Sequence, residues 1–296
     1  LSGVTPKNSF RENKMKERPF SVALFFGVIW IVLPCLGNFV ELPVWDNLNI
    51  GLCGLALILC ICVYLTEYLG LFPLNYSKFS SHGEINSQLG WSICYGAPLV
   101  LYAILWYLSG MPQTIFQLVS LVTYLGHFLK RIIEALFIHK YSKNMLLLPV
   151  IEIAMFYCLG AVTQHYWCNI YTHGPLADKL SSNYVALVVG VPVFVIGESL
   201  NFYHHHILAS LRPAGTLTGY VVPHAGLFHY LVCPHYLGEL IAWYGMAVAG
   251  QHLGMYLAWL VMVCYLSGRS HQTHLWYLKK IENFPKDRRN IFPGIF

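Results

Sequence analysis

Long apolar stretches dominate this sequence and decide what it can fold into. A helix needs roughly 20 residues to cross the hydrocarbon core of a bilayer, and seven stretches reach or exceed that scale: residues 20–40, 50–71, 91–110, 114–139, 147–167, 184–206 and 236–267. Lipid offers no partner for unpaired backbone groups, so such spans are helical. Of all residues, 56% are hydrophobic and only 10% are charged, which is more apolar surface than a soluble domain buries. The sequence therefore predicts an all-α, polytopic membrane bundle.

The basic residues predict how many times the chain crosses the membrane. They gather before the first stretch, after the fourth and after the last: Lys7, Arg11, Lys14, Lys16, Arg18, Lys140, Lys143, Arg269, Lys279, Lys280, Lys286, Arg288 and Arg289. If these flanks share one side, the number of crossings is even. Residues 236–267 should then form a hairpin of two short helices, which gives eight membrane helices with both termini on the basic side, or seven if this stretch crosses once. No cleavable signal sequence is expected, because no small-residue cleavage motif follows the first stretch.

Several classes of function are disfavoured by composition. The nine cysteines lack paired spacing, which predicts reduced, mostly buried thiols without a disulfide or zinc framework. The net charge of +5 comes from the membrane flanks, so nucleic acid is not an expected partner. Fourteen histidines raise the question of a di-iron site, but one spaced pair and one bare triplet do not supply the repeated boxes such a site needs. We expect no metal.

The fourth stretch carries ionisable residues where lipid would penalise them. Lys130, Arg131 and Glu134 stand three and four residues apart and can neutralise one another on one helix face, followed by His139 and Lys140. Charged side chains within a membrane helix are expensive unless they are paired or face water. This cluster is either a buried ion-pair ladder between helices or a polar wall for a charged cofactor.

The final third of the chain carries an ordered set of short motifs. It runs through Asn201, then Leu211, Arg212, Pro213, Ala214 and Gly215, then Gly226, Leu227 and Phe228, then Cys233 to Glu239, then His274, Tyr277, Leu278, Phe284 and Pro285, and ends at Phe292 to Phe296. Together these motifs resemble the steroid 5α-reductase superfamily, and the segment 211–215 is most similar to its trans-2-enoyl-CoA reductase branch. The resemblance implies three parts: a basic arm over residues 1–19, two N-terminal membrane helices with a loop over 20–90, and a steroid-reductase-like domain with a C-terminal cofactor region over 91–296.

The resemblance implies an NADPH-dependent membrane reductase. It assigns the dinucleotide-binding role to eleven residues: Arg131, His139, Lys140, Asn201, Arg212, Tyr220, His235, Glu239, Arg269, His274 and Tyr277. Guanidinium groups among them suit phosphate oxygens. The family reaction adds hydride to a double bond conjugated to a carbonyl, and a membrane-embedded Tyr then supplies a proton with the help of a Glu one helix earlier.

Both proton-handling positions depart from the family pattern. The Tyr position is Phe128, which has no proton to give, and the Glu position is Cys94, a weak donor and a poor carboxylate substitute. Tyr124 lies one turn before Phe128 and is a substitute phenol. Alternatively, Glu67 would restore the carboxylate if the alignment were shifted by one span. The acidic family residue four places after Asn201 is His205.

These departures favour a degenerate reductase that serves as an accessory or structural subunit of a membrane complex. Its first two spans and basic arm would contact other membrane subunits, with Gly51, Gly54 and Ala56 as the close-packing surface, although packing within the same chain is the alternative. An active NADPH-dependent reductase of a lipid, enoyl-CoA or steroid double bond is the competing function. The accessory function implies the mitochondrial inner membrane, and the active reductase implies the endoplasmic reticulum. Membrane lipid is a partner in either case.

Overall fold

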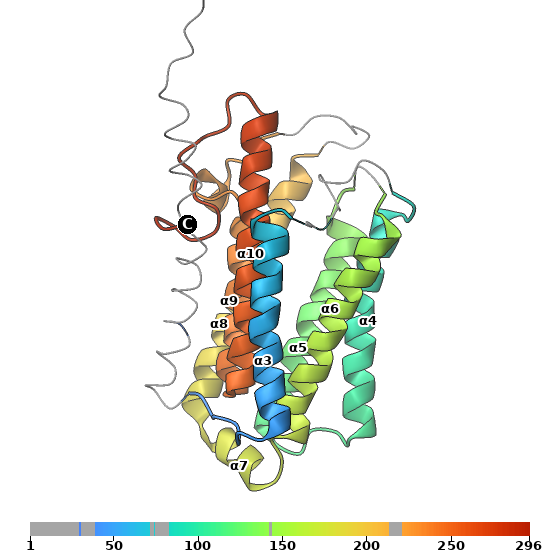
Figure 1. Cartoon of the computed structure of the whole chain (residues 1–296), viewed down its shortest axis with the longest axis vertical. Coiled ribbons are helices and arrows are strands. Elements are labelled where there is room, and N and C mark those ends of the chain that lie inside the picture. Colours follow the sequence, from blue (N-terminus) through green and yellow to red (C-terminus); the bar gives the residue numbers. More distant parts are fainter. Residues whose placement is uncertain (1–29, 31–38, 72–73, 75–82, 142–143, 213–220) are drawn as a thin grey trace, which may run out of the picture.

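The computed structural model describes residues 30, 39–71, 74, 83–141, 144–212 and 221–296. Within these ranges the chain is a bundle of α-helices without a β-strand (Figure 1). The α-helices are α3 (Asn47–Val63), α4 (Ser87–Leu108), α5 (Ile115–Ile133), α6 (Leu147–His165), α7 (Pro175–Ser182), α8 (Tyr184–Ser210), α9 (Pro234–Gly250) and α10 (Leu253–Lys280). The predicted all-α membrane fold is confirmed.

Helix starts follow local capping chemistry. The side chains of Asp46, Asn86 and Thr114 accept hydrogen bonds from backbone N–H groups in the first turns of α3, α4 and α5, which satisfies donors that have no partner inside the helix. Three of the described helices end in π-helical turns: η1 (Tyr64–Tyr68) after α3, η3 (Glu134–Ile138) after α5 and η4 (Tyr166–Ile170) after α6. The first two turns each carry a buried carboxylate, Glu67 in η1 and Glu134 in η3.

The predicted spans agree with the observed helices. Among the described residues, four helical segments are long and apolar enough to cross a membrane: Asn47–Tyr68, Ser87–Leu108, Leu147–Ile170 and Tyr184–Ser210. α5, α9 and α10 complete the bundle. The predicted span 20–40 and the basic arm lie outside the described residues, apart from Trp30, Phe39 and Val40.

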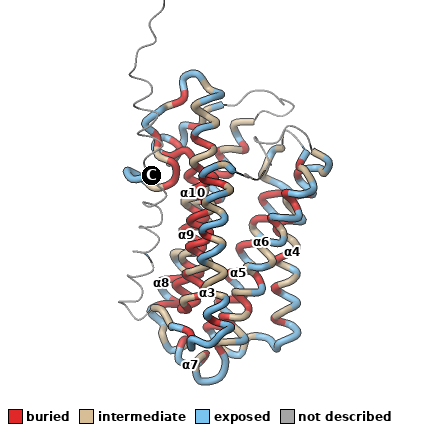
Figure 2. The backbone as a smooth tube through the Cα atoms, in the orientation of Figure 1, coloured by how far each residue is buried: buried red, intermediate tan, exposed pale blue. Residues whose placement is uncertain are grey.

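The predicted hairpin in the last apolar stretch is present. α9 and α10 are joined at Gln251 and His252, where Gln251 adopts a left-handed backbone conformation with φ of 50°. The two helices are not both short, because α10 is 28 residues long and continues well past the apolar stretch. Its C-terminal half carries Arg269 and Tyr277, which follow the predicted apolar stretch in the sequence. α9 and α10 form the buried centre of the bundle (Figure 2).

α8 and α9 approach each other through glycines. A Cβ added to Gly197 would lie 2.2 Å from the backbone nitrogen of Ala242, and one added to Gly238 would lie 2.4 Å from that of Asn201. Gly190 and Gly245 repeat this relation one heptad away, 2.5 Å from Ala249 and 2.3 Å from Phe194. Small residues let helix backbones pack closely in lipid, where no hydrophobic force drives association. This contact fixes the relative positions of Asn201 and Glu239.

α3 joins the same bundle through α10. The helices lie side by side (Figure 1), and the Glu67 carboxylate lies 3.2 Å from Arg269 Nη1. The small residues at the start of α3 behave differently, since a Cβ added to Gly51 or Gly54 would meet no described atom within 4 Å. The described part of the chain therefore does not use these two glycines for packing, whereas Ala56 packs against a buried cluster that includes Val261.

Candidate active site

A cavity of about 310 Å³ lies at the end of the bundle where α5, α8 and α10 finish and α4, α6 and α9 begin. Nine of the eleven positions expected to bind a dinucleotide line it: Arg131, His139, Lys140, Asn201, Arg212, His235, Glu239, Arg269 and Tyr277. These nine residues come from four helices, α5, α8, α9 and α10, and from two loops, so segments far apart in the sequence form one site. Its size falls in the range of small-molecule pockets.

Lys140 and Arg212 form the basic rim of the cavity, where Lys140 is exposed and Arg212 is half-buried. Lys140 Nζ donates to the Arg212 carbonyl oxygen at 2.8 Å, and Arg212 Nη1 donates to the Lys140 carbonyl oxygen. This reciprocal clamp joins the segment after η3 to the end of α8. Each cation has further N–H groups beyond the one used in the clamp, so both can bind phosphate oxygens.

Tyr141 lies next to this rim and also lines the cavity. Burial raises the pKa of its phenol well above the ordinary value, so the group stays protonated at neutral pH. The hydroxyl donates to the Ala135 carbonyl oxygen at 3.2 Å.

Arg131 occupies a deeper position than the phosphate-binding role requires. Its Nη1 lies 2.5 Å from Glu134 Oε2 and 3.0 Å from His205 Nδ1, and its Nη2 donates to the Tyr95 hydroxyl at 2.7 Å. Its side chain is only 10% exposed. A guanidinium already paired with a carboxylate in the interior offers little to a phosphate. The two readings of the charged cluster in α5 therefore combine: Lys130 and Arg131 form a buried ion-pair network, and Arg131 is also part of the cavity wall.

Asn201 and Glu239 connect this network to α9. The Asn201 side-chain amide donates to Glu239 Oε2 at 3.0 Å and to the His235 carbonyl oxygen at 2.9 Å, and its oxygen accepts from Lys130. The ring of His127 bridges two carboxylates, Nδ1 at 2.6 Å from Glu198 and Nε2 at 3.3 Å from Glu239. Opposite charges thus meet inside the bundle, which is the condition for burying them.

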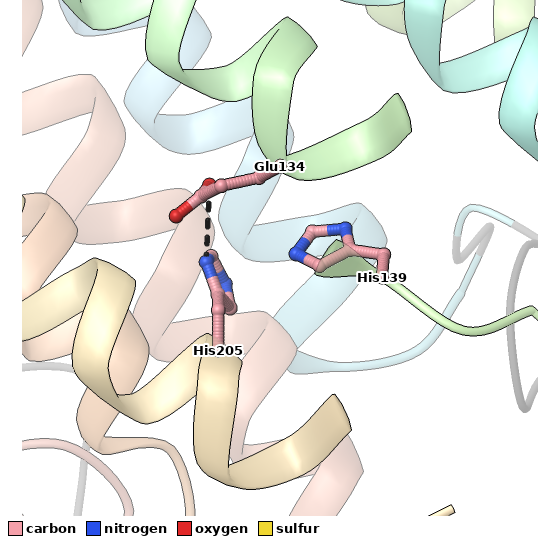
Figure 3. Close-up of side chains that lie close together, drawn as sticks. All are labelled: Glu134, His139 and His205. Atoms are coloured by element: carbon pink, nitrogen blue, oxygen red, sulfur yellow. Dashed lines mark hydrogen bonds and ion pairs between the residues drawn. The ribbon is translucent and has the colours of Figure 1, made fainter. Parts of the chain in front are cut away.

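Glu134, His139 and His205 lie close enough together to be compared with a metal site (Figure 3). Their ligand atoms are all within 4.8 Å of one another. Arg131, however, already contacts both Glu134 and His205, and its positive charge would repel a cation bound at the same atoms. The donor set is therefore satisfied by a guanidinium and does not suit a metal ion.

The two positions at which the motif resemblance predicts proton delivery, Cys94 and Phe128, lie outside the cavity wall. Cys94 is fully buried against Met145 and Val150. Phe128 is also fully buried, with its ring centroid 4.8 Å from that of Tyr124 and 5.3 Å from that of Tyr157. Tyr124, the expected substitute, directs its hydroxyl to the Tyr157 carbonyl oxygen at 3.2 Å. None of these three side chains lines the cavity.

Two further expected residues are not in the wall. His274 is buried behind it, with Nδ1 2.8 Å from Asn290 Oδ1, so its role is to hold the C-terminal segment against α10. Tyr220 lies outside the described residues. Glu67 does not line the cavity but holds Arg269, which does.

The aromatic residues that α4 and α6 contribute to the wall, three in number, were missed by sequence reasoning. Trp91 and Tyr95 stand four residues apart on α4 and stack at 5.4 Å, and Tyr157 on α6 lies 6.0 Å from Tyr95. The spacing of Trp91 and Tyr95 places them on one helix face, which is the signal that could have identified them. They give the basic cavity an apolar, aromatic side.

Comparisons with known proteins identify the family of the chain. The family profile described as 3-oxo-5-alpha-steroid 4-dehydrogenase matches residues 143–296. A very-long-chain enoyl-CoA reductase of Dictyostelium discoideum is 29% identical over 224 residues, covering 71% of this chain and 72% of that protein. The human 3-oxo-5-alpha-steroid 4-dehydrogenase 1 is 33% identical over 182 residues, covering 60% of this chain and 67% of its own length. The chain therefore belongs to the 3-oxo-5-alpha-steroid 4-dehydrogenase family, and the resemblance read from its motifs is confirmed.

Proposed function

We propose that this protein binds NADPH in the cavity and reduces a carbon–carbon double bond conjugated to a carbonyl in a lipid-soluble substrate. The observation that carries the proposal is the convergence of nine expected cofactor positions with three aromatic side chains on one cavity. NADPH, when bound, would supply hydride. Lys140 and Arg212 would hold its phosphates at the rim, and the aromatic wall suits the apolar, conjugated end of a substrate.

The lining charges fit an anionic cofactor. Arg131, Lys140, Arg212 and Arg269 face one carboxylate, that of Glu239. Arg131 and Arg269 are each paired with a carboxylate behind the wall, so the unneutralised positive charge is concentrated at the rim. The relatives named above include an enoyl-CoA reductase and steroid dehydrogenases, and an enoyl thioester or an enone is accordingly the substrate class to test. For this function we propose the endoplasmic reticulum membrane.

A second candidate is a catalytically silent accessory subunit. The burial of Phe128 and Cys94 in packed surroundings favours it, because neither position can deliver a proton to the cavity. The open space around Gly51 and Gly54 on α3 also leaves a close-packing surface for another membrane subunit. In this case the cavity would hold a cofactor or an anionic lipid headgroup without turnover, and the organelle stays a prediction.

Turnover separates the two candidates. Purified full-length protein in lipid nanodiscs should oxidise NADPH in the presence of a trans-2-enoyl-CoA or a 3-oxo-4-ene steroid, with formation of the saturated product. Product is measured by mass spectrometry, and heat-denatured protein is the control. Bound NADPH without any product from either substrate class would support the accessory subunit.

Arg212→Ala tests the cofactor site itself. The change removes a charge-assisted hydrogen-bond donor worth roughly 1.5–3 kcal/mol, so the affinity for NADPH should fall by about 10- to 100-fold in a fluorescence titration. Lys179→Ala is the matched control, since Lys179 pairs with Glu41 at the surface. Unchanged NADPH affinity in folded Arg212→Ala protein would refute the assignment of the rim.

A further inference from the structure

Tyr95 presents a phenol at the cavity wall in a chain whose family phenol position is occupied by Phe128. The side chain is 3% exposed and lines the cavity. Its hydroxyl oxygen accepts a hydrogen bond from Arg131 Nη2 at 2.7 Å, and the guanidinium carbon lies 4.8 Å from the ring centroid. A phenol and a buried cation thus form a fixed pair next to the space where a substrate would sit.

The direction of this hydrogen bond matters for proton transfer. A guanidinium can only donate, so in the bond with Arg131 the Tyr95 oxygen is the acceptor, and the hydroxyl's own hydrogen is not used in it. A phenolate left after proton loss would face a positive charge at hydrogen-bond distance, the arrangement that strengthens such bonds. Tyr141, also in the wall, differs because its hydroxyl donates to a backbone carbonyl.

Arg131 is itself held in place from behind. Glu134 and His205 contact Nη1 at 2.5 and 3.0 Å, while Nη2 faces Tyr95. Both supports are buried, Glu134 in the π-helical turn η3 and His205 on α8. Arg131 is therefore a positioning residue that orients the phenol and offsets the charge that develops on it.

We propose that Tyr95 is the proton donor of this protein, an inference that rests on the proposed function. When hydride adds to the β-carbon, the electron pair of the double bond moves toward the carbonyl and an enolate forms. The O–H bond of Tyr95 then breaks and its proton passes to the enolate oxygen, which gives an enol, while the phenolate remains paired with Arg131. Water takes the enol's hydroxyl proton and delivers a proton to the α-carbon, which gives the saturated carbonyl compound. Water entering at the rim returns a proton to Tyr95. In total the double bond gains one hydride and one proton, and NADPH is oxidised to NADP⁺.

The decisive variant is Tyr95→Phe in the full-length protein. General acid catalysis contributes about 10²- to 10⁴-fold, so turnover of the enoyl-CoA or enone should fall at least about 100-fold, with NADPH affinity changed by less than about twofold. Tyr124→Phe is the matched control because it removes a buried phenol that does not line the cavity, and its turnover should equal that of the unmodified protein. Adding Phe128→Tyr to Tyr95→Phe should not restore turnover, since position 128 lies outside the cavity wall.

A second readout does not depend on turnover. An enone with an isotopically labelled carbonyl, bound without NADPH, should show a carbonyl stretching band at lower frequency in the unmodified protein than in Tyr95→Phe, because the phenol donates to its oxygen. Tyr124→Phe should leave the band unchanged.

The outcomes separate this inference from the proposed function. Full turnover by Tyr95→Phe in an active protein would overturn the Tyr95 assignment and leave the reductase function standing. A protein that lacks turnover but shows the Tyr95-dependent band shift would refute the reductase function while confirming Tyr95 as the carbonyl partner. Absence of both turnover and the band shift would overturn both.

Discussion

Gly197→Ala is expected to lower the free energy of unfolding by roughly 3 kcal/mol, the upper end of the usual cost of overpacking. The added methyl group would lie 2.2 Å from the Ala242 backbone nitrogen and 2.6 Å from its Cα. Backbone atoms cannot rotate away as a side chain does, so α8 and α9 must separate. Thermal unfolding in nanodiscs, followed by intrinsic tryptophan fluorescence, measures the loss.

Gly126→Ala is the control for this prediction. Gly126 is also within a membrane helix, but a Cβ there would meet no described atom within 4 Å. Alanine has the higher helix propensity, so this variant should be as stable as the unmodified protein or slightly more so. Equal stabilities of Gly197→Ala and Gly126→Ala would contradict the close approach of α8 and α9. Because Asn201 and Glu239 sit on these two helices, we also expect Gly197→Ala to weaken NADPH binding.

The fold could be predicted from the sequence because each membrane helix is marked by a continuous apolar stretch in its own part of the chain. Apolar stretches of about 20 residues have the length that a membrane helix needs. The basic flanks predicted that residues 236–267 turn back across the membrane, and the chain does turn at Gln251. The extent of α10 was not readable in this way. Its part after Gly268 mixes charged and polar residues with aromatic and aliphatic ones, and it is held by contacts with the C-terminal segment, such as that of His274 with Asn290.

The site could be predicted only where a motif marks it. Most of the expected cofactor-binding residues lie in short sequence motifs, and most of them line one cavity. The role of each residue, however, depends on which side chains pack around it in the folded protein. The spacing of Arg131 and Glu134 predicts their pairing, but nothing local to Arg131 reveals His205 and Tyr95, because these two partners come from other helices of the chain. Likewise, Tyr95 and its neighbour Cys94 differ by one residue, but one lines the cavity and the other faces Val150. That choice depends on the rotation of α4, which the sequence leaves open.

Glu134→Gln should produce the largest loss of stability among the charged residues. The carboxylate is fully buried and lies 2.5 Å from Arg131 and 3.2 Å from Lys130. An amide keeps the size of the side chain but removes the negative charge, and removing one partner of a buried ion pair typically costs about 3–5 kcal/mol because the other charge stays behind. Thermal unfolding in the same nanodiscs should show a correspondingly large drop.

The exposed ion pair of Glu41 and Lys179 is the control for the Glu134→Gln prediction. Glu41 and Lys179 lie 2.7 Å apart but are 28% and 64% exposed, and such pairs contribute at most about 1 kcal/mol. Glu41→Gln should therefore be nearly silent. If Glu134→Gln cost no more than Glu41→Gln, the buried network would not restrain Arg131. If instead the loss is large and Arg131→Met added to Glu134→Gln recovers part of it, the cost is that of an unpaired guanidinium, because the double variant removes the stranded charge itself.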